Sequence, residues 1–437
     1  MITARAFAGK HYAVYGLARS GLATVEALLA SGARVTAWDD NAEAREKLCS
    51  REGGSPGLGP CLRRDTDWDL AEFHSLIMSP GVPLNRHPLA ARAREANLEI
   101  IGDIELFARA RPELPPHKVV GITGTNGKST TTALVHHILK TAGVPTTMGG
   151  NIGLPILSQD PLPAGGVYVL ELSSYQIDLT QSLDCDVAVL LNITPDHLDR
   201  YESFEAYVAS KARLLDMQTD RHPQVISRET QPTYDHYEER WFEDHDRVFG
   251  IGADEVTDQS NWPALKGPHN AENAAAALAV GRALGLSDDQ IEVGLCSYPG
   301  LPHRMERIRE RGGALFVNDS KATNAEAAAP ALAAYPRIRW IVGGQAKAET
   351  LGDTAKHLDH VVQAYTIGEA GPMFARLLRD HGVTVTECET LENAVNHAAR
   401  DSLSGDVVLL SPACASFDQF RDFEERGDRF RELVGAL

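Results

Sequence analysis

Short apolar segments alternate with longer amphipathic segments along most of the chain. Near its beginning, the apolar runs at 12–15, 34–40 and 75–78 predict strands, and the residues that follow the first run, through Leu29, predict a helix. A strand, a helix and a second strand in this order are typical of a parallel βαβ unit. We therefore expect the first part of the chain to form an open α/β sheet.

The middle of the chain has apolar runs at 118–123, 167–170 and 187–191, and each of them ends in polar residues. The carboxyl ends of parallel strands meet at one edge of a sheet, where open α/β sheets bind their ligands. The polar residues after these runs are therefore predicted to lie together. The stretch 220–265 is polar and irregular, and its pattern predicts no particular fold.

Apolar runs at 314–317, 339–342, 361–367 and 406–410, separated by helical segments, predict a last βαβ-like region. The chain has 437 residues, which exceeds the roughly 250 to 300 residues at which one core stops growing. A proline-rich stretch after residue 108 suits a linker. We thus expect an α/β protein of three domains: an N-terminal Rossmann-like domain (1–108), a central domain with a mostly parallel sheet (109–299) and a C-terminal Rossmann-like domain (300–437).

The composition indicates a globular protein and argues against some classes of binding partner. Hydrophobic residues make up 43% and charged residues 23% of the chain, unlike a disordered protein. The net charge of -18 is spread along the chain, which argues against nucleic acid and anionic membranes as partners. The six cysteines have no C-x-x-C spacing, and no apolar stretch approaches the roughly 20 residues that span a bilayer. A reducing, cytoplasmic location is expected.

The run 119–132 joins an apolar strand to a helix through a glycine-rich turn. Gly124 and Gly127 lack a Cβ and tolerate positive φ, so backbone amides can turn toward phosphate oxygens at the N-terminus of the helix. Lys128 would supply a compensating charge, and Ser129 or the threonine after it a hydroxyl for the Mg²⁺ that accompanies ATP. The alternative is an ordinary turn, but the strand, the Lys-Ser pair and the helix together favour a P-loop-type ATPase domain.

Two polar residues after the next strands are candidate metal ligands. Glu171 directly ends an apolar run, where a carboxylate is costly unless it binds a cation such as Mg²⁺ or is satisfied by neighbouring backbone. His197 follows the third run and is either a ligand or a structural loop histidine.

Lys211 stands in an unusual position. On the helix predicted over 203–217, the spacing of 100° per residue places Lys211 in the centre of an apolar stripe. Burial would lower its pKa and leave a neutral amine, able to react with CO₂ and give a carbamate that binds metal. The alternative is that only its stem is buried and the ammonium reaches water.

Two further regions carry candidate binding residues. The first turn resembles a dinucleotide fingerprint, but Ala18 replaces its middle glycine. The acidic pair Asp39 and Asp40 ends the second strand and either holds a ribose or base or is a solvated strand end. Arg304 is a candidate phosphate ligand, with a surface ion pair as its alternative, and the polar cluster 318–324 between a strand and a helix favours a site.

Together these motifs resemble the Mur ligase superfamily, the ATP-dependent amino-acid ligases of bacterial cell-wall synthesis, which also includes folylpolyglutamate synthetases. The resemblance covers nearly the whole chain. The runs 300–306, 318–324 and 411–427 are most similar to the branch that adds D-glutamate. The Asp-Asn-Pro-Arg box of the branches that add diaminopimelate or lysine is absent.

The resemblance implies an ATP-dependent amide ligase that adds D-glutamate to UDP-N-acetylmuramoyl-L-alanine through an acyl phosphate, in cytoplasmic peptidoglycan precursor synthesis. It implies ATP and two Mg²⁺ ions as cofactors, a carbamylated Lys211, closure of the third domain on its ligands, and a monomer. The implied site residues fall into four groups: for ATP, Gly124, Thr125, Asn126, Gly127, Lys128, Ser129, Thr130, His269, Asn270, Asn273, Arg304 and Asp319; for metal and catalysis, Lys128, Ser129, Glu171, His197 and Lys211; for the UDP-substrate, Arg19, Ser20, Asp39, Asp40, Ser79 and Asn151; and for D-glutamate, Lys321, Thr323, Lys347, Ser416 and Phe423.

Three other functions are weighed against this one. A folylpolyglutamate synthetase would use a pterin and would have no use for a uridine-binding first domain. A nucleotide-switched binding protein would bind ATP but form no amide. A dehydrogenase is disfavoured because Ala18 interrupts the fingerprint and Lys128 would have no role.

Overall fold

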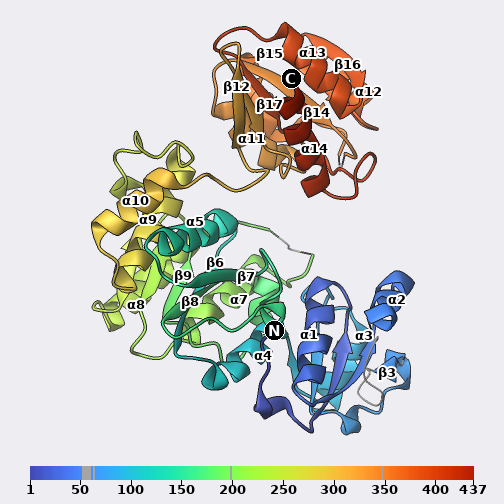
Figure 1. Ribbon diagram of the computed structural model, residues 1–437, viewed down its shortest axis with the longest axis vertical. Coiled ribbons are helices and arrows are strands. Elements are labelled where there is room, and N and C mark those ends of the chain that lie inside the picture. Colours follow the sequence, from blue (N-terminus) through green and yellow to red (C-terminus); the bar gives the residue numbers. More distant parts are fainter. Residues whose placement is uncertain (52–60, 63, 197–198, 347) are drawn as a thin grey trace. The chain divides into compact units, whose positions relative to one another are not determined.

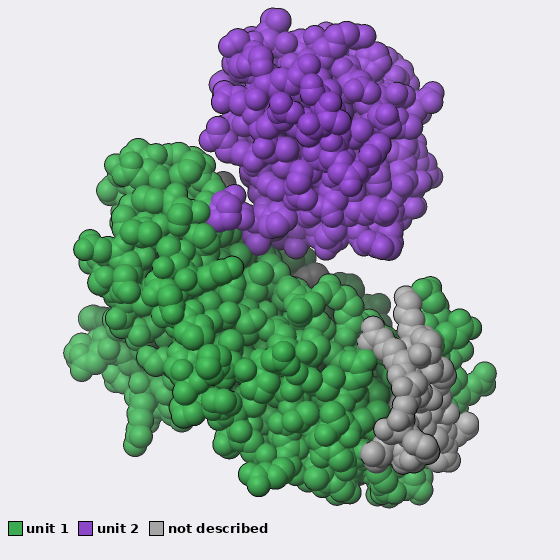
Figure 2. All heavy atoms as spheres, viewed as in Figure 1, with its two compact units in different colours: residues 1–298 green, residues 299–437 purple. Residues whose placement is uncertain are grey.

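The computed structural model describes residues 1–51, 61–62, 64–196, 199–346 and 348–437. They form two compact units, 1–298 and 299–437, which Figure 2 shows in green and purple. Each unit has its own sheets and its own core. The first unit contains two sheets, and its predicted division into two domains stays a prediction.

The first sheet of unit 1 is parallel and has five strands in the order β3-β2-β1-β4-β5 (Figure 1). The strands predicted at 12–15, 34–40 and 75–78 correspond to β1, β2 and β4, which confirms the βαβ opening. β1 is central and fully buried from Tyr12 to Tyr15, so its carboxyl end lies in the middle of the sheet edge. The elements are β1 (His11–Tyr15), α1 (Arg19–Ala30), β2 (Arg34–Trp38), α2 (Ala42–Arg51), β3 (Cys61–Leu62), β4 (Ser75–Met78), α3 (Pro88–Glu95) and β5 (Ile100–Ile101).

The second sheet of unit 1 is also parallel, with six strands in the order β11-β10-β9-β6-β8-β7. The three apolar runs of the middle of the chain become β6, β8 and β9, with β6 between the other two, so their carboxyl ends lie side by side as predicted. The stretch 220–265, for which the pattern predicted no fold, extends this sheet by β10 and β11 with α8 between them. The elements are α4 (Asp103–Ala110), β6 (His117–Thr123), α5 (Lys128–Thr141), β7 (Thr146–Gly150), β8 (Gly166–Glu171), α6 (Ser174–Asp178), β9 (Val187–Leu190), α7 (Phe204–Asp216), β10 (Gln224–Ser227), α8 (Gln231–Glu243), β11 (Val248–Ile251), α9 (Pro268–Ala283) and α10 (Asp288–Ser297).

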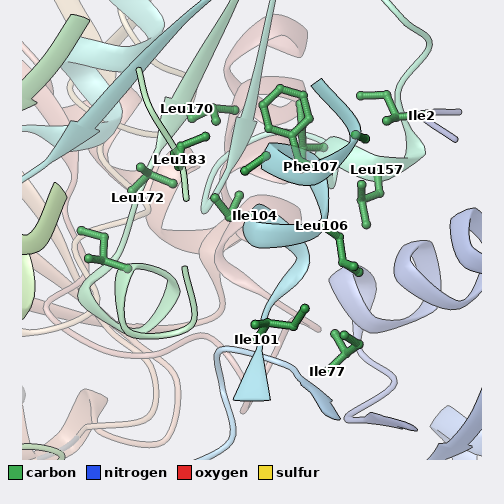
Figure 3. Packing of buried hydrophobic residues seen from close by; sticks show 14 of the residues in the cluster. Ile2, Ile77, Ile101, Ile104, Leu106, Phe107, Leu157, Leu170, Leu172 and Leu183 are labelled. Carbon is green, nitrogen blue, oxygen red and sulfur yellow. The ribbon is translucent and has the colours of Figure 1, made fainter. Parts of the chain in front are cut away.

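A continuous apolar cluster packs against both sheets of unit 1 (Figure 3). It includes Ile77 and Ile101 from the first sheet, Ile104 and Phe107 from α4, and Leu170 from β8. Burial of one such large side chain stabilises the fold by about 1.5–3 kcal/mol. α4 contributes to the same cluster as both sheets, so it connects their cores within the unit.

Unit 2 is built around a six-stranded sheet in the order β12-β13-β17-β14-β15-β16. Its strands are parallel except for β12, which pairs antiparallel with β13, and the predicted runs at 314–317, 339–342, 361–367 and 406–410 are four of them. The α/β class with mostly parallel sheets is thus confirmed. The elements are β12 (Glu306–Arg311), β13 (Ala314–Asn318), α11 (Ala325–Ala333), β14 (Ile338–Gly343), β15 (Val361–Ile367), α12 (Gly371–Asp380), β16 (Val385–Glu389), α13 (Leu391–Asp401), β17 (Val407–Leu410) and α14 (Phe423–Ala436).

Short 3₁₀ helices complete the two units, and none of the helices formed by the described residues is long and apolar enough to cross a membrane. The 3₁₀ helices are η1 (Arg5–Phe7), η2 (Asp65–Asp67), η3 (Leu70–Glu72), η4 (Arg111–Glu113), η5 (Ile156–Ser158), η6 (Ala253–Glu255) and η7 (Gly352–His360).

Candidate functional site

The glycine-rich turn between β6 and α5 is packed so closely that two of its glycines cannot carry a side chain. Gly124 and Gly127 have φ angles of 151° and 81°, which L side chains rarely adopt. A Cβ on Gly124 would lie 2.7 Å from the Cβ of Leu191, and one on Gly127 would lie 2.3 Å from Oδ1 of Asn273. The turn is therefore pressed against the end of β9 and against α9, and its shape is set by these neighbours.

Asn192, the residue after Leu191, is hydrogen-bonded to the turn through its backbone and its side chain. Its carbonyl oxygen accepts a hydrogen bond from the N–H of Thr125 at 2.7 Å, and its side-chain Oδ1 accepts one from the N–H of Asn126 at 3.0 Å. These two amides are thus already engaged. A phosphate at this turn would be met instead by the amides at the beginning of α5, at its partial positive end.

Two lysine side chains converge on one carbonyl of the turn. Nζ of Lys128 donates to the carbonyl oxygens of Gly124 and Thr125 at 2.9 and 2.7 Å, and Nζ of Lys211 donates to the same Gly124 oxygen at 2.7 Å. Lys211 comes from α7, whose N-terminus is capped by the Ser203 side chain. The site therefore brings two amino groups together where a triphosphate would lie, in a chain that is acidic overall.

Lys211 is buried over its whole length. The residue is 2% exposed, and Nζ lies 4.8 Å from the ring centroid of Tyr207. The alternative in which its ammonium reaches water is therefore wrong. Burial, followed by repulsion from Lys128, lowers the pKa of Lys211 to about 7. A substantial fraction of this amine is consequently neutral near pH 7, which is the form that reacts with CO₂.

Glu171 ends β8, and only one of its two carboxylate oxygens has a hydrogen-bond partner among the described residues. It is 2% exposed, and its Oε1 accepts a hydrogen bond from Nδ2 of Asn151 at 2.8 Å. Its Oε2 is buried and has no hydrogen-bond partner among the residues that the structure describes. The chain turns directly into α6 after this strand, because Ser173 and Gln176 form a capping box. A buried carboxylate oxygen without a donor fits a hard cation such as Mg²⁺, which prefers oxygen ligands.

The residues predicted to contact ATP from the beginning of α9 lie beside α5. Oγ1 of Thr131 donates to Oδ1 of Asn273 at 3.0 Å, and Nδ2 of Asn273 donates to Oδ1 of Asn270 at 3.2 Å. Nδ2 of Asn270 in turn donates to the carbonyl of Lys266 at 3.0 Å. The structure thus brings Asn270 and Asn273 next to the helix that carries Ser129 and Thr130.

Some predicted residues are outside the described structure. His197 and Lys347 lie outside the described residues, and so does the side chain of His269. The predictions for these three residues therefore stay untested. Arg304 and Asp319 belong to unit 2, and their predicted contact with ATP is likewise untested.

The UDP-substrate residues predicted in the first sheet gather at its carboxyl edge. Asp39 accepts hydrogen bonds from the N–H of Leu17 at 2.6 Å and of Asn41 at 2.8 Å, so it shapes the turn after β1 and is not a bare strand end. Asp40 accepts one from the hydroxyl of Tyr15 at 2.8 Å. Oγ of Ser79 donates to the carbonyl of Gly16 at 2.8 Å and so fixes the turn further. Arg19, at the start of α1, donates to the carbonyl of Gly153 at 2.7 Å, and Ser20 is the next residue of α1.

Unit 2 brings together several residues predicted to bind D-glutamate. Nζ of Lys321 lies 5.1 Å from the ring centroid of Phe423. Oγ of Ser320, the residue before Lys321, donates to the carbonyl of Phe423 at 2.8 Å. Thr323 lies in the same loop as Lys321, and Ser416 is buried in the loop after β17.

Arg426 joins these loops, a role that the sequence pattern did not reveal. Its side chain is almost fully buried, at 1% exposed, and its guanidinium donates to Oγ and the carbonyl of Ser320 at 3.0 and 2.8 Å. It also donates to the carbonyls of Cys414 and Ala415 at 3.1 and 3.3 Å. Burial lowers the pKa of Arg426 to about 10, so it remains charged at neutral pH. The only signal in the sequence was its place in the motif 411–427.

Asp319 is the buried acid of unit 2. Its Oδ2 accepts from the hydroxyl of Ser411 at 2.7 Å, and its Oδ1 from the N–H of Met305 at 3.2 Å. Burial raises the pKa of Asp319 to about 7. This carboxyl thus holds the chain that enters unit 2 against the end of β17.

Comparison with known proteins shows the family of this chain. The Mur ligase middle domain matches residues 122–262, and the Mur ligase, glutamate ligase domain matches residues 303–414. The UDP-N-acetylmuramoylalanine–D-glutamate ligases of Novosphingobium aromaticivorans and Sphingopyxis alaskensis are 57% and 58% identical to this chain, over all of it and over 97% and 100% of their own lengths.

A solved structure gives the same fold at much lower identity. The UDP-N-acetylmuramate-alanine ligase of Thermotoga maritima has a TM-score of 0.58 and 19% identity, over 98% of this chain and 99% of its own. From the two domain matches and the full-length relatives, the chain belongs to the Mur ligase family.

Proposed function

We propose that this protein is an ATP-dependent ligase that joins D-glutamate to UDP-N-acetylmuramoyl-L-alanine and releases ADP and phosphate. The observation that carries the proposal is the convergence of Lys128 and Lys211 on the Gly124 carbonyl, in a turn tight enough to exclude side chains. Such a site can hold a triphosphate and a second anionic group together. The names of the relatives at 57% and 58% identity support D-glutamate as the amino acid.

Lys128 and the amides at the beginning of α5 would bind the phosphates of ATP. Lys128 now lies across the turn on two carbonyls and can move its charge onto the transferred phosphoryl group. Asn270 and Asn273, already linked to α5 through Thr131, would contact the rest of the nucleotide.

The residues suited to hold Mg²⁺ are Ser129 and the free Oε2 of Glu171, with His197 and a carbamylated Lys211 proposed for a second ion. Bound Mg²⁺ would neutralise charge that develops on the phosphoryl oxygens. Asn151 orients Glu171 for this role by binding its other oxygen.

Carbamylation would use the neutral amine of Lys211. Its nitrogen forms a bond to the carbon of CO₂, one C=O bond becomes a C–O⁻ single bond, and the nitrogen loses one proton. The product is an anionic carbamate in place of a buried ammonium. The neighbouring Lys128 would stabilise the carbamate, because it repels a positive charge on Lys211.

Ligation would proceed in two steps. An oxygen of the L-alanine carboxylate attacks the γ-phosphorus of ATP, so that a P–O bond forms and ADP leaves. The amine of D-glutamate then attacks the acyl carbon, loses a proton, and phosphate leaves. Arg19, Ser20, Asp39, Asp40 and Ser79, with Asn151, are proposed for the UDP-substrate, and Lys321, Thr323, Lys347, Ser416 and Phe423 for D-glutamate.

Phosphate release with a panel of amino acids tests this function. The protein, ATP, Mg²⁺ and UDP-N-acetylmuramoyl-L-alanine are mixed with D-glutamate, L-glutamate, meso-diaminopimelate or L-lysine. We expect release, and an amide product in mass spectrometry, only with D-glutamate. Release that needs neither acceptor nor amino acid would refute the proposal, and a product with a pterin acceptor would favour a folylpolyglutamate synthetase.

The location follows from the same proposal, and the monomeric state is proposed with it. UDP-sugars and ATP are cytoplasmic metabolites, so the enzyme is proposed to act in the cytoplasm, as a monomer. Light scattering of the purified chain should give a mass near the 47.4 kDa of one copy.

A further inference from the structure

A buried carboxylate beside the phosphate-binding turn has no part in the proposed reaction. Glu272 lies on α9 and is 6% exposed. Its Oε1 accepts a hydrogen bond from Oγ of Ser227 at 2.7 Å, and its Oε2 accepts one from Nδ2 of Asn192 at 3.0 Å. A carboxylate is costly to bury unless its oxygens are hydrogen-bonded, so these contacts explain how it is tolerated there.

Asn192 connects this acid to the turn. Its Oδ1 accepts from the N–H of Asn126 at 3.0 Å, while its Nδ2 points to Glu272 and makes only a longer contact of 3.4 Å with the Asn126 carbonyl. Its backbone carbonyl accepts from the N–H of Thr125. One residue thus bonds to the turn on one side and to the carboxylate on the other.

The charge of Glu272 selects the orientation of the Asn192 amide. An ionised carboxylate can only accept hydrogen bonds, so it must face the NH₂ end of the amide. The oxygen end then faces the N–H of Asn126. With the amide reversed, two acceptors would meet at Glu272 and two donors at Asn126. Glu272 is buried, so the loss of this hydrogen bond would be costly there.

We propose that Glu272 is a positioning residue for the phosphate-binding turn, acting through the side chain of Asn192. It fixes the amide of Asn126 beside the end of β9, where the Asn192 backbone already holds Thr125, so that Lys128 and the amides of α5 meet the phosphates in a single arrangement. The role rests on the proposed use of ATP at this turn. A turn that is ordered beforehand loses less conformational entropy on binding and therefore binds more tightly.

Replacement of Glu272 by alanine tests the role. Alanine suits a helix, and the change removes the carboxylate that accepts from Asn192 and Ser227. We expect the Kd for ADP, measured by calorimetry, and the KM for ATP to rise about tenfold, as for the loss of one hydrogen bond to a charged group. The KM values for D-glutamate and for the UDP-substrate should stay as in the wild type. Glu272→Gln keeps one acceptor oxygen for Asn192 and can donate to Ser227, so it should restore most of the loss.

A double-mutant cycle with Asn192→Ala tests the route. If Glu272 acts through Asn192, then Glu272→Ala should add little to the effect of Asn192→Ala on the Kd for ADP. Additive effects of the two substitutions would overturn the proposal. If Glu272→Ala does not fold, Asn192→Ala alone decides, because an unchanged Kd for ADP in that variant would also overturn it.

Glu105 provides a matched control in the same unit. It is a buried carboxylate on α4, 1% exposed, and accepts hydrogen bonds from the N–H groups of Gln181 and Ser182 at 2.7 and 2.9 Å. Glu105→Ala should lower the Tm but leave the Kd for ADP unchanged. The same pattern in Glu272→Ala would show a merely structural role and refute the proposal.

The binding measurement also separates the two hypotheses. ADP binding needs no D-glutamate. A wild-type protein that binds ADP but forms no amide would contradict the proposed function, and the effect of Glu272→Ala on ADP binding would still be measurable.

Discussion

Arg426→Met should weaken the contacts between the loops that carry the proposed D-glutamate site of unit 2. Methionine fills a similar length with an apolar chain but donates no hydrogen bonds. Arg426 makes four hydrogen bonds to Ser320, Cys414 and Ala415. The carbonyl of Ala415 also accepts from the N–H of Gln345 at 2.9 Å and keeps that partner. The substitution therefore mainly strips the carbonyls of Ser320 and Cys414.

The expected loss of stability follows from these contacts. Each buried acceptor left without a donor costs about 1–3 kcal/mol. Two of them give about 2–6 kcal/mol, and removal of a desolvated charge offsets part of this. We expect a net loss of about 2–3 kcal/mol for the unfolding of unit 2. Because Ser320 precedes Lys321 and Ala415 precedes Ser416, the KM for D-glutamate should rise with little change in the KM for ATP.

Calorimetry of the full chain and hydrogen exchange measure this effect. Faster exchange is expected in peptides that cover 319–323 and 414–416. Arg421→Met is the matched control, since Arg421 is 79% exposed and pairs with Asp422 on the surface, where ion pairs contribute about 0–1 kcal/mol. Unchanged exchange in both peptides, or equal effects of the two substitutions on the KM for D-glutamate, would refute the reasoning.

The remaining predictions concern Lys211 and Glu171. Lys211→Ala should abolish ligation, and formate or acetate should partly restore it by replacing the carbamate; full activity of this variant at low CO₂ would contradict the carbamate. In CO₂-free buffer, the depressed pKa of Lys211 means that the unfolded chain binds more protons than the native one between about pH 7 and 10.5. Native stability should then rise with pH in this window, and Lys211→Met should flatten the rise in Tm; an identical profile would argue against burial of the charge. Asn151→Ala frees the second oxygen of Glu171, so the Mg²⁺ concentration for half-maximal activity should rise about 10- to 100-fold, whereas an unchanged requirement would remove Glu171 from the metal site.

Local patterns in the sequence were enough to predict the parts of the site that lie on regular elements. The end of β8 at Glu171 could be predicted because an apolar run stopped at a carboxylate. Lys211 could be placed on the inner face of α7 because helical periodicity depends only on spacing. That its ammonium is buried could not be decided from periodicity, because a lysine stem can be buried while its charge reaches water.

The contacts that position these residues come from distant parts of the chain. β10 and β11 are only four residues long and lie in a polar stretch of the sequence, so both strands were missed. They pair with each other, and β10 also pairs with β9, which the local sequence does not reveal. Glu272 meets Asn192 across 80 residues, and Arg426 meets Ser320 across 106. Neither pair leaves a local pattern in the sequence.

The sequence by itself determined the α/β class, the positions of the most apolar strands and the polar residues that follow them. Their hydrophobic period is local, so it is written in consecutive residues. Only the tertiary structure decided which buried polar groups find partners, because a hydrogen bond depends on distance and direction between atoms that folding brings together. Among the residues that the structure describes, none donates to Oε2 of Glu171. Folding also brings Lys211 to the Gly124 carbonyl and places the Asn192 amide between Glu272 and the phosphate-binding turn.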